Sequence, residues 1–257
     1  MPFTNAASLL ENRLGDFIAF WGLRAVASDM SNQPTPEQIK AGQAVYTPRT
    51  LQIYDFLVLF LSNRFIWRCP TPYLVEHYDR HVSGNHLDVG VGTGYFLDHC
   101  RFPVERPRIA LMDLNQNTLD YAARRIVRHA LETYLANVLE PIDVHARPFD
   151  SLGLNYLLHC LPGPLESKSV VFDHLLPYLN PGATVFGSTL LHGGVQRGLL
   201  ARWLMSNYNR KGIFSNEQDS LDVLQQELAH RFNHVSITVR GCVALFSAQV
   251  RSMTSAS

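Results

Sequence analysis

The sequence predicts a doubly wound α/β fold, built on a mostly parallel seven-stranded sheet with an antiparallel C-terminal hairpin and an N-terminal helical cap. Three observations predict it. From Asn85 onward, short β-rich runs alternate with helical segments, which is typical of a parallel sheet covered by helices. Residues 86–95 read as a strand that ends in a glycine-rich turn and opens directly into a helix. The last two strands are joined through Gly241 without an intervening helix, which predicts a hairpin.

The first eighty residues are expected to be almost entirely helical. Residues 8–30 carry apolar side chains at three-to-four spacing, and Ser8 with Glu11 fits the pattern of an N-terminal cap. A loop is expected over residues 31–36, followed by a mostly buried helix over 51–65 and another over 73–80. Eighty helical residues exceed what a core requires. We therefore expect residues 1–80 to form a cap over a binding site and residues 81–257 to form the α/β domain.

The pattern predicts seven strands and four helices after the cap. The strands are expected near residues 86–89, 108–112, 134–139, 149–154, 183–190, 234–239 and 243–250. The helices are expected near residues 95–100, 118–129, 165–179 and 218–232. The third of these helices is expected to end at Asn180-Pro181-Gly182, which supplies a stop, a proline and a glycine suited to a helix C-terminus.

Composition narrows the class of protein. Lys and Arg number 22 and are balanced by 22 Asp and Glu, so no basic face for a nucleic acid is indicated. The apolar stretches are too short or too charged to span a bilayer, and no N-terminal signal pattern is expected because Glu11, Arg13 and Asp16 interrupt the apolar residues that a signal peptide needs. The four cysteines form no paired motif, which favours buried thiols in a reducing compartment over disulfides or a metal site. We expect a cytoplasmic protein without a nucleic-acid, membrane or metal partner.

Candidate ligand-binding residues follow the strands, because ligands of open α/β sheets bind beyond the carboxyl ends of the strands. Gly90, Gly92 and Gly94 follow the first strand and allow a close backbone approach. Asp88 places a negative charge beside that turn, which favours a positively charged ligand over a pyrophosphate. Asp113 follows the second strand, and its two oxygens suit the vicinal hydroxyls of a ribose.

Further strand ends complete the expected nucleoside site. Asn137, Val138 and Leu139 lie at the end of the third strand and are suited to bracket an adenine with an amide and apolar contacts. Asn155, Tyr156, Leu157 and His159 follow the fourth strand.

These motifs resemble those of a known family. The turn Asp88-Val-Gly-Val-Gly-Thr-Gly94 resembles motif I of class I S-adenosylmethionine-dependent methyltransferases. Leu111-Met-Asp-Leu-Asn115 is similar to their second motif, whose acidic residue holds the cofactor ribose. Similar order and spacing continue through residues 149–156 and 179–188, so the resemblance covers about residues 85–191. Asn137 departs from the Asp that many members carry, but an amide oxygen can also accept from the adenine amino group.

The resemblance implies S-adenosylmethionine as cofactor and S-adenosylhomocysteine as product. Asp88 would then lie near the amino acid moiety of the cofactor and Asp113 on its ribose. The cofactor-binding residues that we expect are Tyr46, Asp88, Gly90, Gly92, Gly94, Asp113, Leu114, Asn137, Val138 and Asn155. Tyr46 is included because this family often closes its site with an N-terminal segment, to which Arg49 and Tyr54 also belong.

Two other interpretations of the glycine turn are weaker. A nicotinamide or flavin enzyme needs a third glycine at the position that Tyr95 occupies here, and its fold lacks a terminal hairpin. A turn without any ligand would not explain why Asp113 and Asn137 follow at the expected places.

The acceptor is expected to be a small molecule, because signatures of several other acceptors are absent. No Asn-Pro-Pro-Tyr tetrapeptide, no Pro-Cys dipeptide and no paired aspartates of a magnesium site are present. His159 and His192 are candidate bases for the acceptor, and Tyr156 can contact either cofactor or acceptor. Each histidine also has a purely structural interpretation: His159 can form only hydrogen bonds within its loop, and His192 can simply end a strand. Residues 208–214 are a candidate wall of the acceptor pocket.

The sequence predicts O-methylation of a natural product or biosynthetic intermediate. N- and C-methylation are not separated from it, and a protein that binds S-adenosylmethionine for another reaction, such as cyclisation, stays open. The oligomeric state also stays open, with a homodimer as one candidate.

Overall fold

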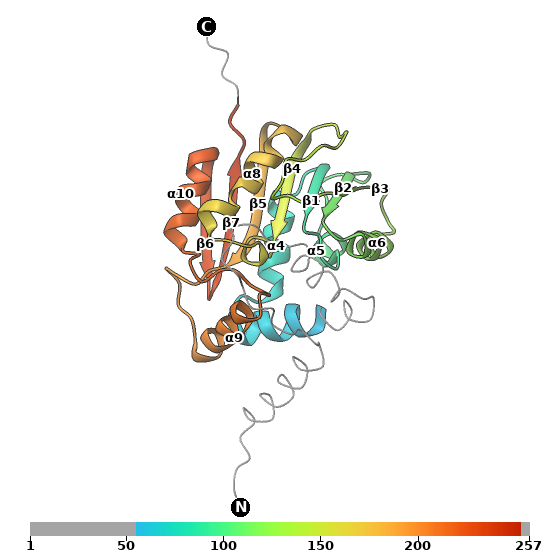
Figure 1. The fold of residues 1–257 in the computed structure, drawn as a ribbon. Coiled ribbons are helices and arrows are strands. Elements are labelled where there is room, and N and C mark those ends of the chain that lie inside the picture. The colour runs from blue at the N-terminus through green and yellow to red at the C-terminus, as the bar shows by residue number, and fades with distance from the viewer. Residues whose placement is uncertain (1–54, 253–257) are drawn as a thin grey trace, which may run out of the picture.

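A computed structural model describes residues 55–252 of the chain, and their core is a seven-stranded sheet of order β3-β2-β1-β4-β5-β7-β6 (Figure 1). The strands are β1 (Asn85–Val89), β2 (Arg108–Asp113), β3 (Leu131–Leu135), β4 (Phe149–Asn155), β5 (Leu179–Leu190), β6 (Asn233–Arg240) and β7 (Val243–Gln249). Neighbours from β3 to β5 are parallel, whereas β7 is antiparallel to both β5 and β6. The predicted doubly wound sheet with a C-terminal hairpin is therefore confirmed.

The strand order reverses between β1 and β4, because the chain proceeds outward from β1 to β2 and β3 and then returns to β4 on the other side. Such a switch point leaves a crevice at the carboxyl ends of the two central strands. The glycine turn after β1 and the segment after β4 both begin there.

Helices cover both faces of the sheet. One face carries α4 (Thr71–His81), α5 (Tyr95–His99) and α6 (Gln116–Arg125). These helices pack on the side chains that the strands direct to this face, such as Ile109 and Leu111 of β2. The other face carries α7 (Leu165–Lys168), α8 (Val170–Leu175) and α10 (Leu221–Arg231), with Leu87 and Val89 in their core. Consecutive strand residues thus serve opposite faces, as the two-residue period of a strand requires.

A third core cluster closes the end of the sheet. The helix η1 (Asp55–Ile66), wound as a π-helix, and α9 (Leu199–Arg210) lie side by side at the end where α4 begins (Figure 1). Ile66, Trp67 and Leu74 pack there with Leu204 and Leu245. The described part of the predicted cap is therefore helical and joined to the sheet; the helix expected over 8–30 and the residues Tyr46, Arg49 and Tyr54 lie outside the described residues.

Three predicted boundaries were wrong. β3 ends at Leu135 and not at residue 139, so the adenine candidates Asn137 and Val138 lie in the loop that follows. The single helix expected over 165–179 is divided into α7, α8 and the short turn η3 (Leu176–Tyr178). Asn180-Pro181-Gly182 does not end a helix but lies within β5, where the pairing with β4 shifts register. The helix α9 was not predicted.

Candidate active site

The glycine turn lies at the carboxyl end of β1, and each of its three glycines has a positive φ (66° at Gly90, 54° at Gly92 and 72° at Gly94). Backbone of this kind favours glycine over any residue with a side chain. A Cβ at Gly90 would stand 2.7 Å from Leu157, and a Cβ at Gly94 would stand 3.1 Å from Ala122. At Gly92, a Cβ would meet no described atom within 4 Å.

The three glycines therefore have different tasks. Gly90 and Gly94 let neighbouring parts of the protein pack against the turn, whereas the described residues leave the space above Gly92 open. A methyl group would fill that space, which makes Gly92 the position where a ligand can approach the backbone closely.

The carboxylate of Asp113 connects the end of β2 to this turn. It accepts a hydrogen bond from the backbone N–H of Asn115 at 2.9 Å, and N–H groups of Leu114 and Gly92 also donate to it. Burial raises the pKa of Asp113 to about 6, although these N–H groups work in the opposite direction. Asp113 is thus held in one orientation beside the open space at Gly92.

A second carboxylate, Asp88, is buried behind the turn with 4% of its surface exposed. Burial raises the pKa of Asp88 well above its usual value, and the nearby charge of Asp113 adds to this effect. Oδ2 of Asp88 lies 3.4 Å from Nε2 of His86, a fully buried histidine whose pKa burial lowers to about 3. Sequence reasoning did not single out His86.

The predicted adenine residues follow β3 and are held in a turn. Oδ1 of Asn137 accepts from the N–H of Leu139 at 3.1 Å, and its Nδ2 donates to Glu140 at 2.8 Å. The backbone N–H of Ala136 donates to the carbonyl of Asp113, which places this turn beside the second strand end. Val138 is buried in the core. The assignment of adenine to Asn137 and Val138 stays a prediction.

Leu114 directly follows Asp113, and 40% of its surface is exposed. An exposed leucine at a strand end offers a flat apolar contact for a purine ring. Its position is compatible with the predicted role, which stays a prediction as well.

Asn155 and Tyr156 form the end of β4. Oδ1 of Asn155 accepts from the hydroxyl of Ser188 at 3.0 Å, while its buried Nδ2 has no hydrogen-bond partner among the described residues. Tyr156 has a φ of 55°, an uncommon conformation for a residue with a side chain. Its hydroxyl donates to Oδ1 of Asn63 at 2.9 Å, so Tyr156 reaches from the strand end to the helix η1.

The two candidate bases occupy different environments. His159, in the turn η2 (Leu158–Cys160), is 3% exposed and meets the ring of Phe214 edge to face at 4.7 Å between ring centres. Burial and the positive charge of Lys168 lower its pKa to about 3. His192 follows β5 and is half-buried; burial and Arg197 lower its pKa, and Glu217 partly offsets them.

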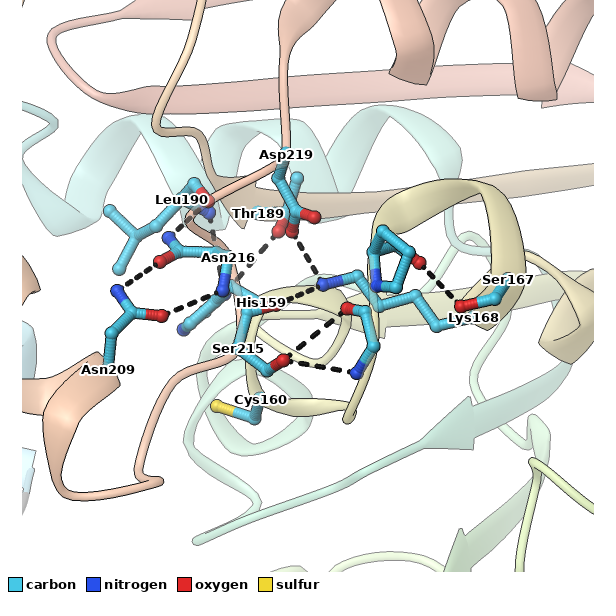
Figure 2. A network of polar contacts seen from close by, with 12 residues as sticks. His159, Cys160, Ser167, Lys168, Thr189, Leu190, Asn209, Ser215, Asn216 and Asp219 are labelled. Atoms are coloured by element: carbon cyan, nitrogen blue, oxygen red, sulfur yellow. Dashed lines mark hydrogen bonds and ion pairs between the residues drawn. The ribbon is translucent and has the colours of Figure 1, made fainter. Parts of the chain in front are cut away.

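A buried polar network fixes the segment between α9 and α10 against these strand ends (Figure 2). Lys168 donates to Asp219 and to the carbonyl of Ser215, at 2.6 Å in each case, and the side chains of both ion-pair members are fully buried. Asn216 donates to the carbonyl of Leu190, the last residue of β5, at 2.9 Å.

The same segment holds both histidines through their backbones. The N–H of Ser215 donates to the carbonyl of His159 at 2.8 Å, and the N–H of His192 donates to the carbonyl of Asp219 at 2.9 Å. Sequence reasoning missed Lys168 and Asp219. They are separated by 51 positions, and no motif links them.

The described residues contain no cluster of His, Cys, Asp and Glu that could hold a metal ion. Within the same part of the chain, no helix is long and apolar enough to cross a membrane. The four cysteines Cys69, Cys100, Cys160 and Cys242 are free thiols.

Comparison with known proteins yields consistent matches. A family model described as a methyltransferase domain matches residues 68–228. The chain is 41% identical over 212 residues to the demethylluteothin O-methyltransferase of Streptomyces thioluteus, which covers 82% of this chain and 92% of that protein. It is 38% identical over 213 residues to the physcion biosynthesis cluster O-methyltransferase of Aspergillus chevalieri, covering 80% and 94% respectively.

Among solved structures, the fold is similar to phosphoethanolamine N-methyltransferase 2 of Haemonchus contortus, which was solved with S-adenosyl-L-methionine. The TM-score is 0.59, and the match covers 87% of this chain and 62% of that one. At 12% identity, this likeness speaks for the fold alone.

Proposed function

The chain belongs to the methyltransferase family, and from that premise we propose that it transfers the methyl group of S-adenosylmethionine to an oxygen atom of a small organic molecule. The observation that carries the proposal is the 41% identity, over 92% of its length, to an O-methyltransferase named for a natural product, demethylluteothin. Family membership also confirms the resemblance predicted from the glycine turn and Asp113.

The residues at the switch point fit the proposed cofactor. The open space at Gly92 admits a ligand against the backbone, and the fixed carboxylate of Asp113 can accept from the two hydroxyls of a ribose. Leu114 offers an apolar surface beside it. Asp88 adds a negative charge for the amino group of the methionine moiety. When it is bound, the cofactor supplies an electrophilic methyl group on a sulfonium, from which a neutral thioether is released as a good leaving group.

The task of the protein is then to align the acceptor and to remove its proton. Tyr156 stands at the end of β4 in its uncommon conformation and carries a ring that can pack on the reactants. Phe214 and Tyr208 contact each other edge to face at 4.9 Å between ring centres. Together with Tyr156 they belong to the hydrophobic cluster that η1 and α9 share. We propose that an aromatic acceptor packs on this side.

Of the two candidate bases, His192 fits the role better. Nδ1 of His159 accepts from the N–H of Leu190 at 3.4 Å, so the ring proton of neutral His159 lies on Nε2. To act as a base, His159 would have to become positively charged while it is buried beside Lys168. His192 is half-buried, and its lowered pKa keeps it neutral and able to accept a proton at neutral pH.

Other parts of the proposal concern partners and location. The balanced charge supports a small-molecule acceptor over a nucleic acid. We also propose a cytoplasmic location, which the four free cysteines support. A homodimer remains our candidate for the assembly.

The experiment is methyl transfer from isotopically labelled S-adenosylmethionine to a panel of phenols, enols, amines and activated carbon acids. Label in a methyl ether supports the proposal, whereas label on nitrogen or carbon alone corrects the acceptor atom. Binding of the cofactor with a new product but no label transfer would favour a non-methylating reaction. His192→Gln is expected to lower kcat with little change in KM; His145→Gln, at an exposed position, is the control.

A further inference from the structure

A chain of four buried or half-buried polar groups runs from the glycine turn into the sheet. Oδ2 of Asp88 lies 3.4 Å from Nε2 of His86, whose Nδ1 lies 2.8 Å from Oγ of Ser151. Oγ of Ser151 donates to Oγ of Ser83 at 2.9 Å, and Oγ of Ser83 donates to the carbonyl of Asn85 at 2.9 Å. Nothing in the proposed methyl transfer uses His86 or the two serines.

Each proton along this chain has a fixed position. The carbonyl of Asn85 can only accept, so the hydroxyl proton of Ser83 points to it. The single hydroxyl proton of Ser151 is then directed to Ser83, and Ser151 must accept from His86. The proton of His86 therefore lies on Nδ1. Its Nε2 presents a lone pair to Asp88, and two acceptors would face each other unless a further proton lies between them.

The surroundings of Asp88 favour that further proton. Burial raises the pKa of Asp88, and the negative charge of Asp113 on β2 adds to this effect. The hydroxyl of Tyr78 on α4 converges on the same place, since a Cβ at Gly153 would stand 3.1 Å from it and 3.0 Å from Oδ2 of Asp88. Cys100 follows α5; burial raises the pKa of its thiol, and the negative charge of Asp88 adds to this effect. None of these three neighbours carries a positive charge at neutral pH.

We propose that Asp88 and His86 share one proton before the cofactor binds, and that this proton leaves to solvent when the ammonium group of the cofactor reaches Asp88. The inference rests on the proposed function, because it assigns the methionine moiety to Asp88. In the free protein, the shared proton makes the pair neutral and spares two neighbouring carboxylates their mutual repulsion. In the complex, Asp88 is an anion and the ammonium takes over the stabilising role of the proton.

The consequence is that cofactor binding depends on pH in a definite direction. A proton that must leave before binding competes with the ligand, so affinity rises with pH. Below the pKa of the Asp88–His86 pair, each pH unit changes the dissociation constant about tenfold, because one proton is exchanged per ligand. His86 acts here as a positioning residue and touches no reactant.

The test is calorimetric titration of S-adenosylhomocysteine, which carries the ammonium but does not react. Titrations at one pH in two buffers with different ionisation enthalpies count the protons released. Because the pKa of Asp113 is raised only to about 6, titrations above neutral pH leave Asp113 ionised and isolate Asp88. We expect wild-type protein to release a substantial fraction of one proton and to bind more tightly as the pH rises.

Asp88→Asn is the decisive variant. Its amide can donate to Nε2 of His86 as a protonated carboxyl does, so the variant imitates the protonated state at every pH. We expect it to release no proton above neutral pH and to bind with the weak affinity that the wild type shows at the acid end. Proton release that persists in Asp88→Asn would overturn the assignment.

A matched pair of histidine variants tests the role of His86. His86 and His81 stack on the same ring, Phe186, at 5.7 Å and 5.6 Å between ring centres, and only His86 has a described contact with Asp88. His86→Phe removes the lone pair that accepts the proton, so the pH dependence is expected to move toward acid. His81→Phe is expected to leave it unchanged. Equal profiles for both variants and the wild type would overturn the shared proton.

Failure of the inference and failure of the proposed function are distinguishable. If S-adenosylhomocysteine binds with pH-independent affinity, the shared proton is refuted and the cofactor assignment stands. If neither it nor S-adenosylmethionine binds at any pH, the proposed function itself is refuted.

Discussion

The hydroxyl of Tyr156 donates a hydrogen bond of 2.9 Å to Oδ1 of Asn63, and this bond joins the end of β4 to the helix η1. Asn63 is fully buried and in turn donates to the hydroxyl of Thr71 at 3.1 Å, at the start of α4. The end of β4, the helix η1 and the start of α4 are thus joined in one hydrogen-bonded unit.

Tyr156→Phe tests this connection. The substitution keeps the ring but leaves the buried Oδ1 of Asn63 without that donor, which costs about 1–3 kcal/mol. We expect a loss of this size in the free energy of unfolding, measured by urea denaturation, and a higher KM for the acceptor. Tyr73→Phe on α4 is the control, because it also removes a tyrosine hydroxyl but retains the ring over which the guanidinium of Arg240 lies. Equal stability of the two variants would contradict the role of the Tyr156 hydroxyl.

The two glycines Gly92 and Gly94 are expected to respond differently to alanine. Both substitutions strain a positive φ, at a cost of about 1–2 kcal/mol. At Gly94, the new methyl group also collides with Ala122 and Ile126 at 3.1 Å, so the larger loss of stability is expected there. At Gly92, the methyl group enters open space, so the main loss is expected in affinity for S-adenosylhomocysteine. Calorimetry and thermal denaturation of both variants provide the comparison. The opposite ranking would show that Gly92 does not face the ligand.

His77 gives a prediction for pH. Burial lowers its pKa to about 4, and its Nε2 donates to the carbonyl of Phe246 at 2.9 Å. The unfolded chain binds a proton at His77 at a higher pH than the folded protein does. The contribution of His77 to the free energy of unfolding is therefore fully present above about pH 6.5, and it is lost as the pH decreases toward about 4.

The expected loss from this one group is about 1.4 kcal/mol per pH unit at most within that window. Other groups titrate there too, including Asp113 and Asp219, whose raised pKa values act in the opposite direction. The measurement is therefore a difference between variants. The deficit of His77→Gln relative to wild type is expected to shrink as the pH falls from 6.5 toward 4, and the exposed His145→Gln is the control variant. A constant deficit would contradict the assignment.

Lys168→Met tests the buried network shown in Figure 2. Removal of the ammonium leaves the carboxylate of Asp219 buried and unpaired, which is expected to cost about 3–5 kcal/mol. Adding Asp219→Asn to this variant removes the uncompensated charge, and part of the stability is expected to return. Chemical denaturation of the single and double variants measures both effects, with Lys211→Met at the end of α9 as the control. If the double variant is no more stable than Lys168→Met, the ion pair does not account for the loss.

The sequence predicted those features that have a local pattern. The central strands carry apolar side chains at alternate positions, such as Leu87 and Val89 in β1, and the turn from Asp88 to Gly94 has its own glycine spacing, so both were placed correctly. Edge strand β3 was misplaced by a few residues because its half-buried residues alternate with exposed ones and give a weaker signal. In α9, Leu199 and Trp203 are exposed, which obscured the amphipathic pattern.

Features that depend on distant pairs had no signal in the sequence. The contact of Lys168 with Asp219 and that of Tyr156 with Asn63 join residues 51 and 93 positions apart. The pairing of His86 with Asp88 is local. The sequence pattern nevertheless does not distinguish a strand histidine that shares a proton from one that is buried only for packing. The role of His86 came from the directions of its two ring nitrogens, which only the folded structure supplies.

The most direct test of the account is calorimetric titration of S-adenosylhomocysteine into the wild type and into Asp113→Asn, with Asp120→Asn on the exposed face of α6 as control. The account predicts binding by the wild type and the control. It predicts a loss of roughly tenfold to a hundredfold in affinity for Asp113→Asn, since hydrogen bonds to a charged group contribute about 1.5–3 kcal/mol. Absence of binding by the wild type, or equal affinity of Asp113→Asn, would contradict the claim that this strand end holds the cofactor.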